Sequence, residues 1–142
     1  MHKVRSLFVT FALVALASSA AACGGPLTYQ VQGTQMANGA DAKVVAEVDE
    51  AKHQTKIMVE AQNLAPPGRI ADSGKVFVLW QRKGSDAAWS RIGTLDFDAD
   101  KRKGKFEGTV PEVSFDFVLS VEPEPSVASP SGKAVFEKHV AK

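Results

Sequence analysis

The chain has 142 residues, of which 44% are hydrophobic and 23% are charged, and its formal net charge at pH 7 is +1. This length and composition fit a single globular domain with its own hydrophobic core. The balanced charge excludes the basic surplus typical of nucleic-acid-binding domains, so we expect no nucleic-acid partner. The single cysteine excludes a disulfide within the chain.

The first 22 residues have the three-part layout of a secretory signal peptide. A basic start with Lys3 and Arg5 precedes the apolar run LFVTFALVALA, and small residues follow that run. The apolar run is shorter than the roughly 20 residues of a bilayer-spanning helix. We therefore predict a helical, cleaved signal peptide at residues 1–22 rather than a permanent membrane span.

Cys23 follows three alanines, and this stretch resembles the lipobox of bacterial lipoproteins, which most often has Leu where Ala20 stands. The resemblance implies cleavage before Cys23 and lipidation of its thiol with palmitate-type acyl chains. Two such chains suffice for stable anchoring in a membrane. The alternative is an ordinary signal-peptidase site that leaves a free cysteine. A lone reactive thiol in an oxidising compartment is a liability, which favours the lipidated form.

The residue after Cys23 is Gly24, which is not acidic. This resembles lipoproteins that are sent to the outer membrane. We expect a protein of the cell envelope that is lipid-anchored on the extracytoplasmic side, in the outer membrane if the cell has one. The membrane, reached through the N-terminal lipid, is thus one expected partner, and an envelope protein is a second.

The remaining chain divides into a tether at residues 23–28 and one domain at residues 29–142. Alternating apolar and polar residues, typical of half-buried strands, occupy 42–49, 55–61 and 114–121. The run VFVLW at 76–80 is apolar on both faces, which predicts a strand in the middle of a sheet. Further strands are expected at 28–35, 89–97, 105–110 and 133–139.

Stretches rich in proline and glycine at 65–74 and 123–132 predict loops, and 49–53 and 83–87 predict short turns. No segment after the signal peptide has a convincing helical period. Seven or eight short strands joined by regular turns predict an all-β fold, an immunoglobulin-like antiparallel β-sandwich. A small β-barrel is the alternative.

The second half of the chain resembles the C-terminal, extracytoplasmic domain of the anti-sigma-K factor family. Five features follow one another in the order found in that family. They are an aromatic strand ending in Leu-Trp, a Gly-Thr-Leu, an acidic turn with a glycine, a Ser-Val-Glu-Pro and a Pro-Ser-Gly. The residues that carry the resemblance are Leu79, Trp80, Gly93, Thr94, Leu95, Gly104, Phe117, Ser120, Glu122, Pro123, Pro130 and Gly132.

The resemblance implies a β-sandwich on the outer side of a membrane, without catalytic residues. Members of that family carry a cytoplasmic domain and a membrane span before the sandwich, and here a signal sequence stands in their place. An exported lipoprotein does not meet a cytoplasmic sigma factor. The resemblance therefore implies a sensing or docking role in the envelope.

One weak candidate metal site appears in the sequence. Oxygen ligands at Asp96, Asp98, Asp100 and Glu107 have the spacing of a calcium-binding loop. Lys101 stands where such a loop requires glycine, and no helices flank it, so a charged turn between two strands is the favoured reading. His53 and His139 with Met36 and Met58 form a still weaker copper candidate.

Candidate partner contacts are Trp89, near a loop, and the acidic pair Glu122 and Glu124 beside prolines at a strand end. No serine has the setting of a nucleophile elbow, and no phosphate-binding loop is present. We expect neither an enzyme nor a cofactor. The predicted function is binding or sensing in the cell envelope. The alternatives are a regulatory partner of a transmembrane anti-sigma system, and a metal-binding or enzymatic periplasmic protein.

Overall fold

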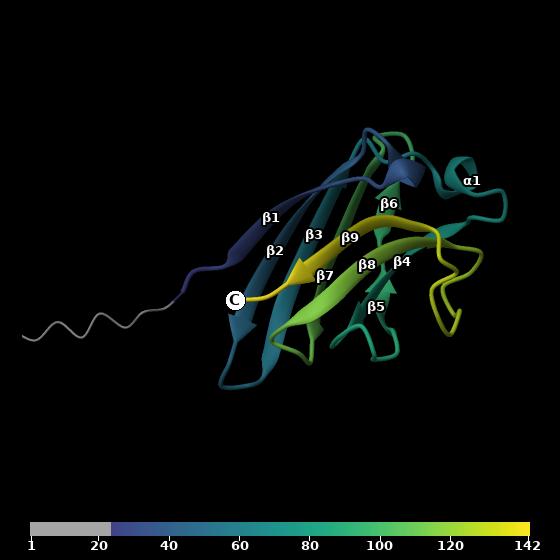
Figure 1. Cartoon of the computed structure of the whole chain (residues 1–142). Helices are drawn as coiled ribbons and strands as arrows, with labels where there is room; N and C mark the ends of the chain where they lie inside the picture. The colour runs from purple at the N-terminus through teal and green to yellow at the C-terminus, as the bar shows by residue number, and fades with distance from the viewer. Residues whose placement is uncertain (1–23) are drawn as a thin grey trace, which may run out of the picture.

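Two antiparallel sheets face each other in the computed structural model, which describes residues 24–142 (Figure 1). The five-stranded sheet has the order β1 (Leu27–Gln32), β2 (Asp41–Asp49), β3 (Gln54–Gln62), β7 (Lys103–Val110) and β6 (Asp96–Asp98). The four-stranded sheet has the order β5 (Ser90–Thr94), β4 (Val76–Arg82), β8 (Phe115–Glu122) and β9 (Ala134–Val140). The predicted all-β sandwich is confirmed. The predicted signal peptide and the lipidation of Cys23 lie outside the described residues.

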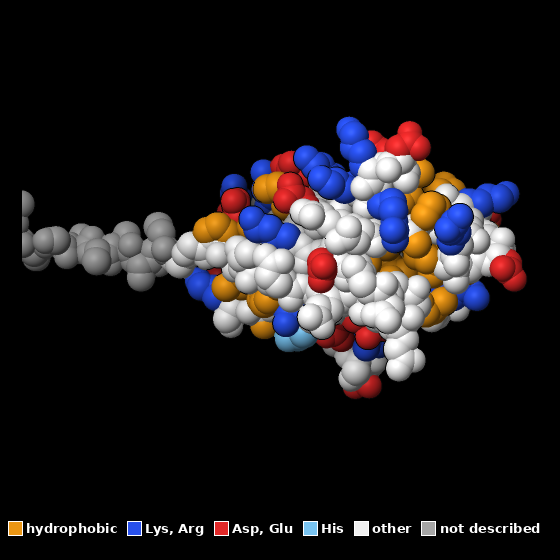
Figure 2. Space-filling model, turned by 90° about the horizontal axis from the view of Figure 1, so that it is seen from above, with side chains coloured by type: hydrophobic (Ala, Val, Ile, Leu, Met, Phe, Trp, Pro, Cys, Tyr) orange, Lys and Arg blue, Asp and Glu red, His pale blue; other side chains and the backbone are white. Residues whose placement is uncertain are grey.

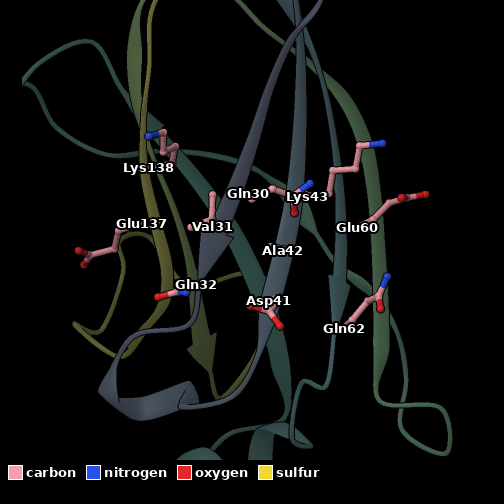
Figure 3. A pocket seen from close by; sticks show the side chains of 10 residues that line it. All are labelled: Gln30, Val31, Gln32, Asp41, Ala42, Lys43, Glu60, Gln62, Glu137 and Lys138. Atoms are coloured by element: carbon pink, nitrogen blue, oxygen red, sulfur yellow. The ribbon is translucent and has the colours of Figure 1, made fainter.

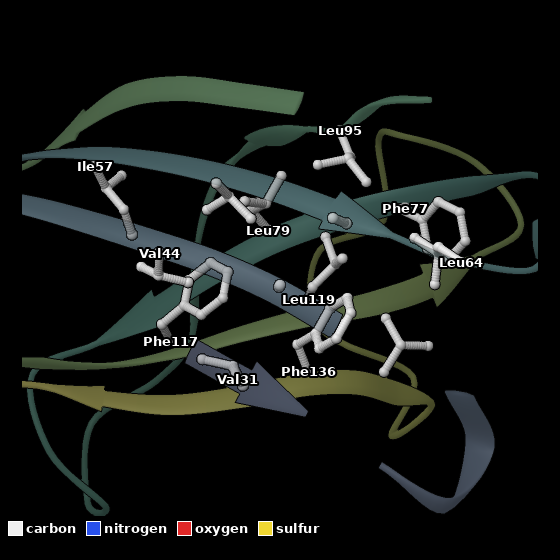
Figure 4. Packing of buried hydrophobic residues seen from close by; sticks show 14 of the residues in the cluster. Val31, Val44, Ile57, Leu64, Phe77, Leu79, Leu95, Phe117, Leu119 and Phe136 are labelled. Atoms are coloured by element: carbon white, nitrogen blue, oxygen red, sulfur yellow. The ribbon is translucent and has the colours of Figure 1, made fainter. Parts of the chain in front are cut away.

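The hydrophobic core fills the space between the two sheets (Figure 4). Val44 and Ile57 reach it from the five-stranded sheet, and Leu79, Phe117 and Phe136 reach it from the four-stranded sheet. Successive side chains of a strand point to opposite faces, so the alternation of apolar and polar residues in β2 and β3 buries one face and leaves the other in water. With a single cysteine in the chain, this apolar burial stabilises the fold.

The four-stranded sheet is buried on both faces around strand β4. This strand lies between β5 and β8, as its doubly apolar sequence predicts. Its outer face carries Val78 and Trp80, which pack with Val118 in a second small cluster. Val127, from the loop after β8, and Trp89 partly cover that cluster. Trp80 is therefore a fully buried residue that packs beneath these loops rather than between the sheets.

The structure has nine strands within the described residues, not seven or eight. The difference arises in residues 89–97, which were expected to form one strand. The chain leaves the four-stranded sheet after Thr94 and joins the five-stranded sheet at Asp96. Leu95 makes this crossing with its side chain buried, and its amide donates to the carbonyl of Phe77 at 3.0 Å. One edge of the sandwich is closed in this way.

At the opposite edge, β1 and the residues that follow it contact β9 and the residue after it. Near one end, the amide of Thr34 donates to the carbonyl of Val135 at 2.9 Å. Near the other end, the hydroxyl of Tyr29 donates to the carbonyl of Ala141 at 3.0 Å. In addition, Nζ of Lys138 on β9 lies 4.8 Å from the centroid of the Tyr29 ring on β1. A hollow bordered by Glu137 and Lys138 lies along this edge.

The local structure differs from the sequence prediction in three segments. Strand β1 begins at Leu27, inside the predicted tether 23–28, because Leu27 and Tyr29 pack against the core. The loop predicted at 65–74 contains one helical turn, α1 (Pro67–Ile70), and the β1–β2 connection contains the 3-10 turn η1 (Gln35–Ala37). Proline at the start of α1 supplies a backbone angle that suits a first helical turn.

The loop predicted at 123–132 and the turn at its end are confirmed. Strand β8 ends at Glu122, immediately before Pro123, and Gly132 has a φ of +87° just before β9 begins. This angle lies in the left-handed region that favours glycine.

Both ends of the described chain lie at one end of the sandwich, which we call the tether end (Figure 1). Gly24 and Lys142 line the same surface hollow there. Helix α1 and the turn between β6 and β7 lie at the other, distal end. No helix within residues 24–142 has the length and apolar character needed to cross a bilayer.

Candidate functional site

A row of three interacting side chains lies on the outer face of the four-stranded sheet. Antiparallel pairing sets Arg82 of β4 opposite Asp116 of β8, and Asp116 opposite His139 of β9. Residues directly opposite each other share a face of the sheet, so their side chains meet. Nε of Arg82 donates to Oδ2 of Asp116 at 3.1 Å, and Nδ1 of His139 lies 2.8 Å from Oδ1.

These contacts favour the ionised form of Asp116. The hydrogen bond from His139 is the largest cause of a lowered pKa, and the hydrogen bond and positive charge of Arg82 add to it. Partial burial of the carboxylate opposes the effect without cancelling it. Asp116 thus holds Nδ1 of an exposed imidazole in a fixed orientation.

Trp89 completes the site from the loop before β5. The guanidinium carbon of Arg82 lies 4.4 Å from the centroid of the Trp89 ring, a cation–π contact. Arg82 also donates from Nη1 to the carbonyl of Ser85 at 3.3 Å, which ties the same loop to β4. The ring is half-buried against the cluster around Trp80 and remains partly open to solvent.

Together these residues border a hollow of about 330 Å³, which we call the Trp89 hollow. Its lining consists of Arg82, Trp89, Asp116, Phe117, Val118, Glu137, Lys138 and His139. Tryptophan and arginine are enriched among the residues that dominate protein–protein binding energy. The lining contains no serine, threonine or cysteine that His139 would activate as a nucleophile. The arrangement suits binding.

The Trp89 hollow lies at the tether end of the sandwich. His139 precedes by two residues Ala141, whose carbonyl accepts the hydrogen bond from Tyr29 near the start of β1. The chain enters β1 from Gly24, which lies beside Lys142. The hollow and the attachment point of the N-terminal segment are therefore neighbours.

The acidic residues of the predicted calcium loop do not converge on one point. Asp98 uses Oδ1 to accept hydrogen bonds from the amides of Asp100 and Lys101, at 3.1 and 3.0 Å, within the β6–β7 turn. Glu107 pairs with Lys56 at 2.8 Å, and Asp96 lies opposite Lys105. These contacts make the segment a charged turn between two strands, the reading that the sequence favoured.

The lowered pKa of Asp98 has the same origin, since the Lys101 amide is its largest cause. Within residues 24–142, no group of three or more His, Cys, Asp or Glu side chains is placed to hold a metal ion. The weak copper candidate is also not assembled. His139 and Met58 lie on the outer faces of different sheets, and His53 sits in the β2–β3 turn, 3.8 Å from Glu112.

Glu122 was wrongly predicted as a partner contact, because its side chain is fully buried. Oε1 of Glu122 accepts hydrogen bonds from the hydroxyl of Ser120 at 2.6 Å and from the amide of Ser131 at 2.9 Å. Ser120 in turn accepts a hydrogen bond from Nε1 of Trp80 at 2.8 Å. Buried polar groups are stable only when they are paired in this way. Glu124, in the following loop, is exposed.

A second hollow, of about 270 Å³, lies at the distal end and is lined by Ala65, Pro66, Arg69, Ala99 and Arg102. In the view of Figure 2, apolar side chains at the end away from the N-terminal segment are bordered by Lys and Arg. Over the rest of that face acidic and basic side chains are interspersed, without one large field of a single sign.

Comparison of the chain with protein-family models, with curated proteins and with solved structures found no match. The resemblance to the anti-sigma-K factor domain therefore stays a prediction. The sequence pointed to Trp89 but missed Arg82 and Asp116, and it named His139 only as part of the weak copper candidate. Only strand register brings these residues together, and register is not readable from the spacing of polar residues in separate strands.

Proposed function

We propose that this protein is a non-catalytic, lipid-anchored binding or sensing module of the bacterial cell envelope, and that the Trp89 hollow docks a membrane-anchored protein. The signal-like segment and Cys23 support the anchoring. The mixed charge of the hollow, with an arginine stacked on a tryptophan, supports recognition of a protein surface.

The observation that carries this proposal is the position of the hollow at the tether end. An acylated Cys23 would lie only a few residues before β1, so this end of the sandwich would face the bilayer. A partner that is itself held in the membrane would present its extracytoplasmic part at the same distance from the bilayer surface as this end of the sandwich. Two proteins confined to one surface also meet at high effective concentration, which lowers the affinity that docking requires.

The more specific candidate is a regulatory partner of a transmembrane anti-sigma system. Its support is the ordered set of residues, from Leu79 to Gly132, that resembles the anti-sigma-K factor domain. A metal-binding or enzymatic role is the remaining candidate. Its support is His139, whose Nδ1 is held by Asp116 while the rest of the ring is exposed.

In-cell crosslinking of the tagged, full-length protein tests the proposal, with mass spectrometry of what is captured. We expect one dominant membrane-anchored partner, and we expect Trp89→Ala to reduce its capture at equal protein level. Capture of many abundant envelope proteins, unchanged by Trp89→Ala, would contradict docking at this hollow. A dominant partner that is an anti-sigma regulator would support the more specific candidate.

A further inference from the structure

A separate hollow of about 640 Å³ lies across β1, β2 and β3 and reaches β9 (Figure 3). Glu137 and Lys138 form its border on β9. Its volume falls within the range of small-molecule binding sites in proteins. Glu137 and Lys138 also border the Trp89 hollow, so the two hollows meet at β9, but the proposed docking uses none of the side chains on β1, β2 and β3.

The register of three strands arranges the side chains of this hollow in two rows. One row is Gln32, Asp41 and Gln62, and the other is Gln30, Lys43 and Glu60. Directly opposite residues share a face, so all six side chains stand on the outer face of the five-stranded sheet. Neighbouring strands are about 4.8 Å apart, and alternate residues of one strand are about 6.7 Å apart. The grid covers the area of one or two sugar rings.

The six polar side chains of this grid form no hydrogen bonds or ion pairs with each other. None of the six side chains forms an ion pair or a side-chain hydrogen bond within residues 24–142, although Lys43 lies directly opposite Glu60. On the same face, Lys56 does pair with Glu107 at 2.8 Å. The side chains over the hollow are thus left available for a ligand.

The chemistry of these groups specifies the class of ligand. A glutamine amide donates two hydrogen bonds through nitrogen and accepts through oxygen, a carboxylate only accepts, and an ammonium only donates. A sugar hydroxyl both donates and accepts, so a run of hydroxyls is satisfied by a surface that alternates these three groups. The hollow carries three carboxylates, Asp41, Glu60 and Glu137, against two lysines, Lys43 and Lys138. This near balance favours an uncharged ligand over a polyanion or a polycation.

We propose that the hollow over β1, β2 and β3 binds an uncharged glycan chain, with Gln30, Gln32 and Gln62 as the principal hydrogen-bonding residues. Recognition rests on hydrogen bonds to side chains that water also reaches, so the affinity is weak, with a Kd of about 1 mM. None of these three glutamines lines the Trp89 hollow, so either proposal stands if the other fails.

Titration of the full-length protein in detergent micelles, followed by backbone amide NMR shifts, tests this proposal. The probes are two uncharged tetrasaccharides, one of N-acetylglucosamine and one of glucose. We expect saturable shifts in β1, β2 and β3 with at least one probe. Shifts with only the N-acetylated probe identify an acetamido sugar as the ligand, and shifts with both identify a general polyhydroxyl site.

Variants of the chain locate the site. Gln30→Ala and Gln62→Ala each remove hydrogen bonds to the ligand, and each should weaken binding by about fivefold. Gln54→Ala is the matched control, because Gln54 is a glutamine on β3 that does not line the hollow. The affinity of this variant for the tetrasaccharides should equal that of the unmodified protein. No saturable shift with either probe up to about 10 mM, shifts confined to other surfaces, or equal weakening by Gln54→Ala would overturn the proposal.

Discussion

Asp116 and His139 are joined across β8 and β9 by a contact of 2.8 Å between Oδ1 and Nδ1, and Arg82 holds the other oxygen of the same carboxylate. The row links three strands of one sheet and fixes the wall of the Trp89 hollow. The contribution of this row to the free energy of unfolding depends on the ionisation of Asp116, which His139 and Arg82 both favour.

Stability should depend on pH through Asp116. Its folded-state pKa is below the ordinary value of 3.8, so the unfolded state binds the proton more readily. The stabilisation is therefore fully present above the unfolded pKa and is lost as the pH falls through the folded one. Asp116→Asn should lower the free energy of unfolding by about 1 kcal/mol at pH 6, with the difference shrinking below pH 3.8.

Urea denaturation of both proteins across this pH range measures the effect. Asp86→Asn is the control, because Asp86 is exposed and forms no ion pair within the described chain. If the difference in unfolding free energy between Asp116→Asn and the unmodified protein stayed constant down to the lowest pH, the pH dependence would not arise from Asp116.

The buried network around Ser120 should be costly to interrupt. Ser120→Ala leaves the indole nitrogen of Trp80 without an acceptor and removes one donor from the buried carboxylate of Glu122. Unpaired buried polar groups cost about 1–3 kcal/mol each, so we expect a loss of at least 1 kcal/mol. Unfolding followed by tryptophan fluorescence measures it, with Ser90→Ala on the exposed surface of β5 as the control. Equal stability of the two variants would refute the network's role.

Gly33 should be intolerant of a side chain for steric reasons. A Cβ at this position would collide with the backbone carbonyl of Ala37, and the amide of Gly33 donates to the carbonyl of Ala40 at 2.8 Å. Gly33→Ala should destabilise the fold by about 1–3 kcal/mol. Gly84→Ala is the control, since no atom lies within 4 Å of a Cβ there. Thermal melts that shift equally for both variants would show that the connection after β1 has room to relax.

The proposed anchoring through Cys23 has a direct consequence for fractionation. We expect the mature protein to begin at a diacylated Cys23 and to sediment with membranes, because two acyl chains hold a protein stably in a bilayer. Cys23→Ala should move it to the soluble fraction or block its processing. Mass spectrometry of the mature N-terminus is the measurement, and an unmodified thiol at Cys23 would end the lipoprotein hypothesis.

Much of the fold follows from local patterns. The alternation of apolar and mostly polar residues in β2 and β3 reflects one buried face, and the doubly apolar VFVLW of β4 reflects burial on both faces. The prediction fails where the chain changes sheets, because Leu95 is apolar and buried at the crossing, and Ile92 before it and Phe97 after it pack against the same core. The sequence therefore predicts one strand where the structure has β5 and β6.

The candidate site was less predictable for two physical reasons. The sequence predicted Glu122 as a surface residue because carboxylates are seldom fully buried. Its hydrogen-bond partners Ser120 and Ser131 could not be predicted, because the contact with Ser131 depends on the conformation of the loop after β8. Arg82, Asp116 and His139 come from three strands whose relative register depends on the whole sheet. Trp89 alone was identifiable, as a large aromatic residue beside a loop.

Site-specific photocrosslinking in cells tests docking at the Trp89 hollow most directly. A photoreactive residue replaces the exposed Asp86, in the loop that carries Trp89, or the exposed Asp72, after α1 at the distal end. We predict that position 86 captures one dominant membrane-anchored protein, that Trp89→Ala abolishes this product, and that position 72 does not yield it. The same product from both positions, or none from position 86, would contradict the account.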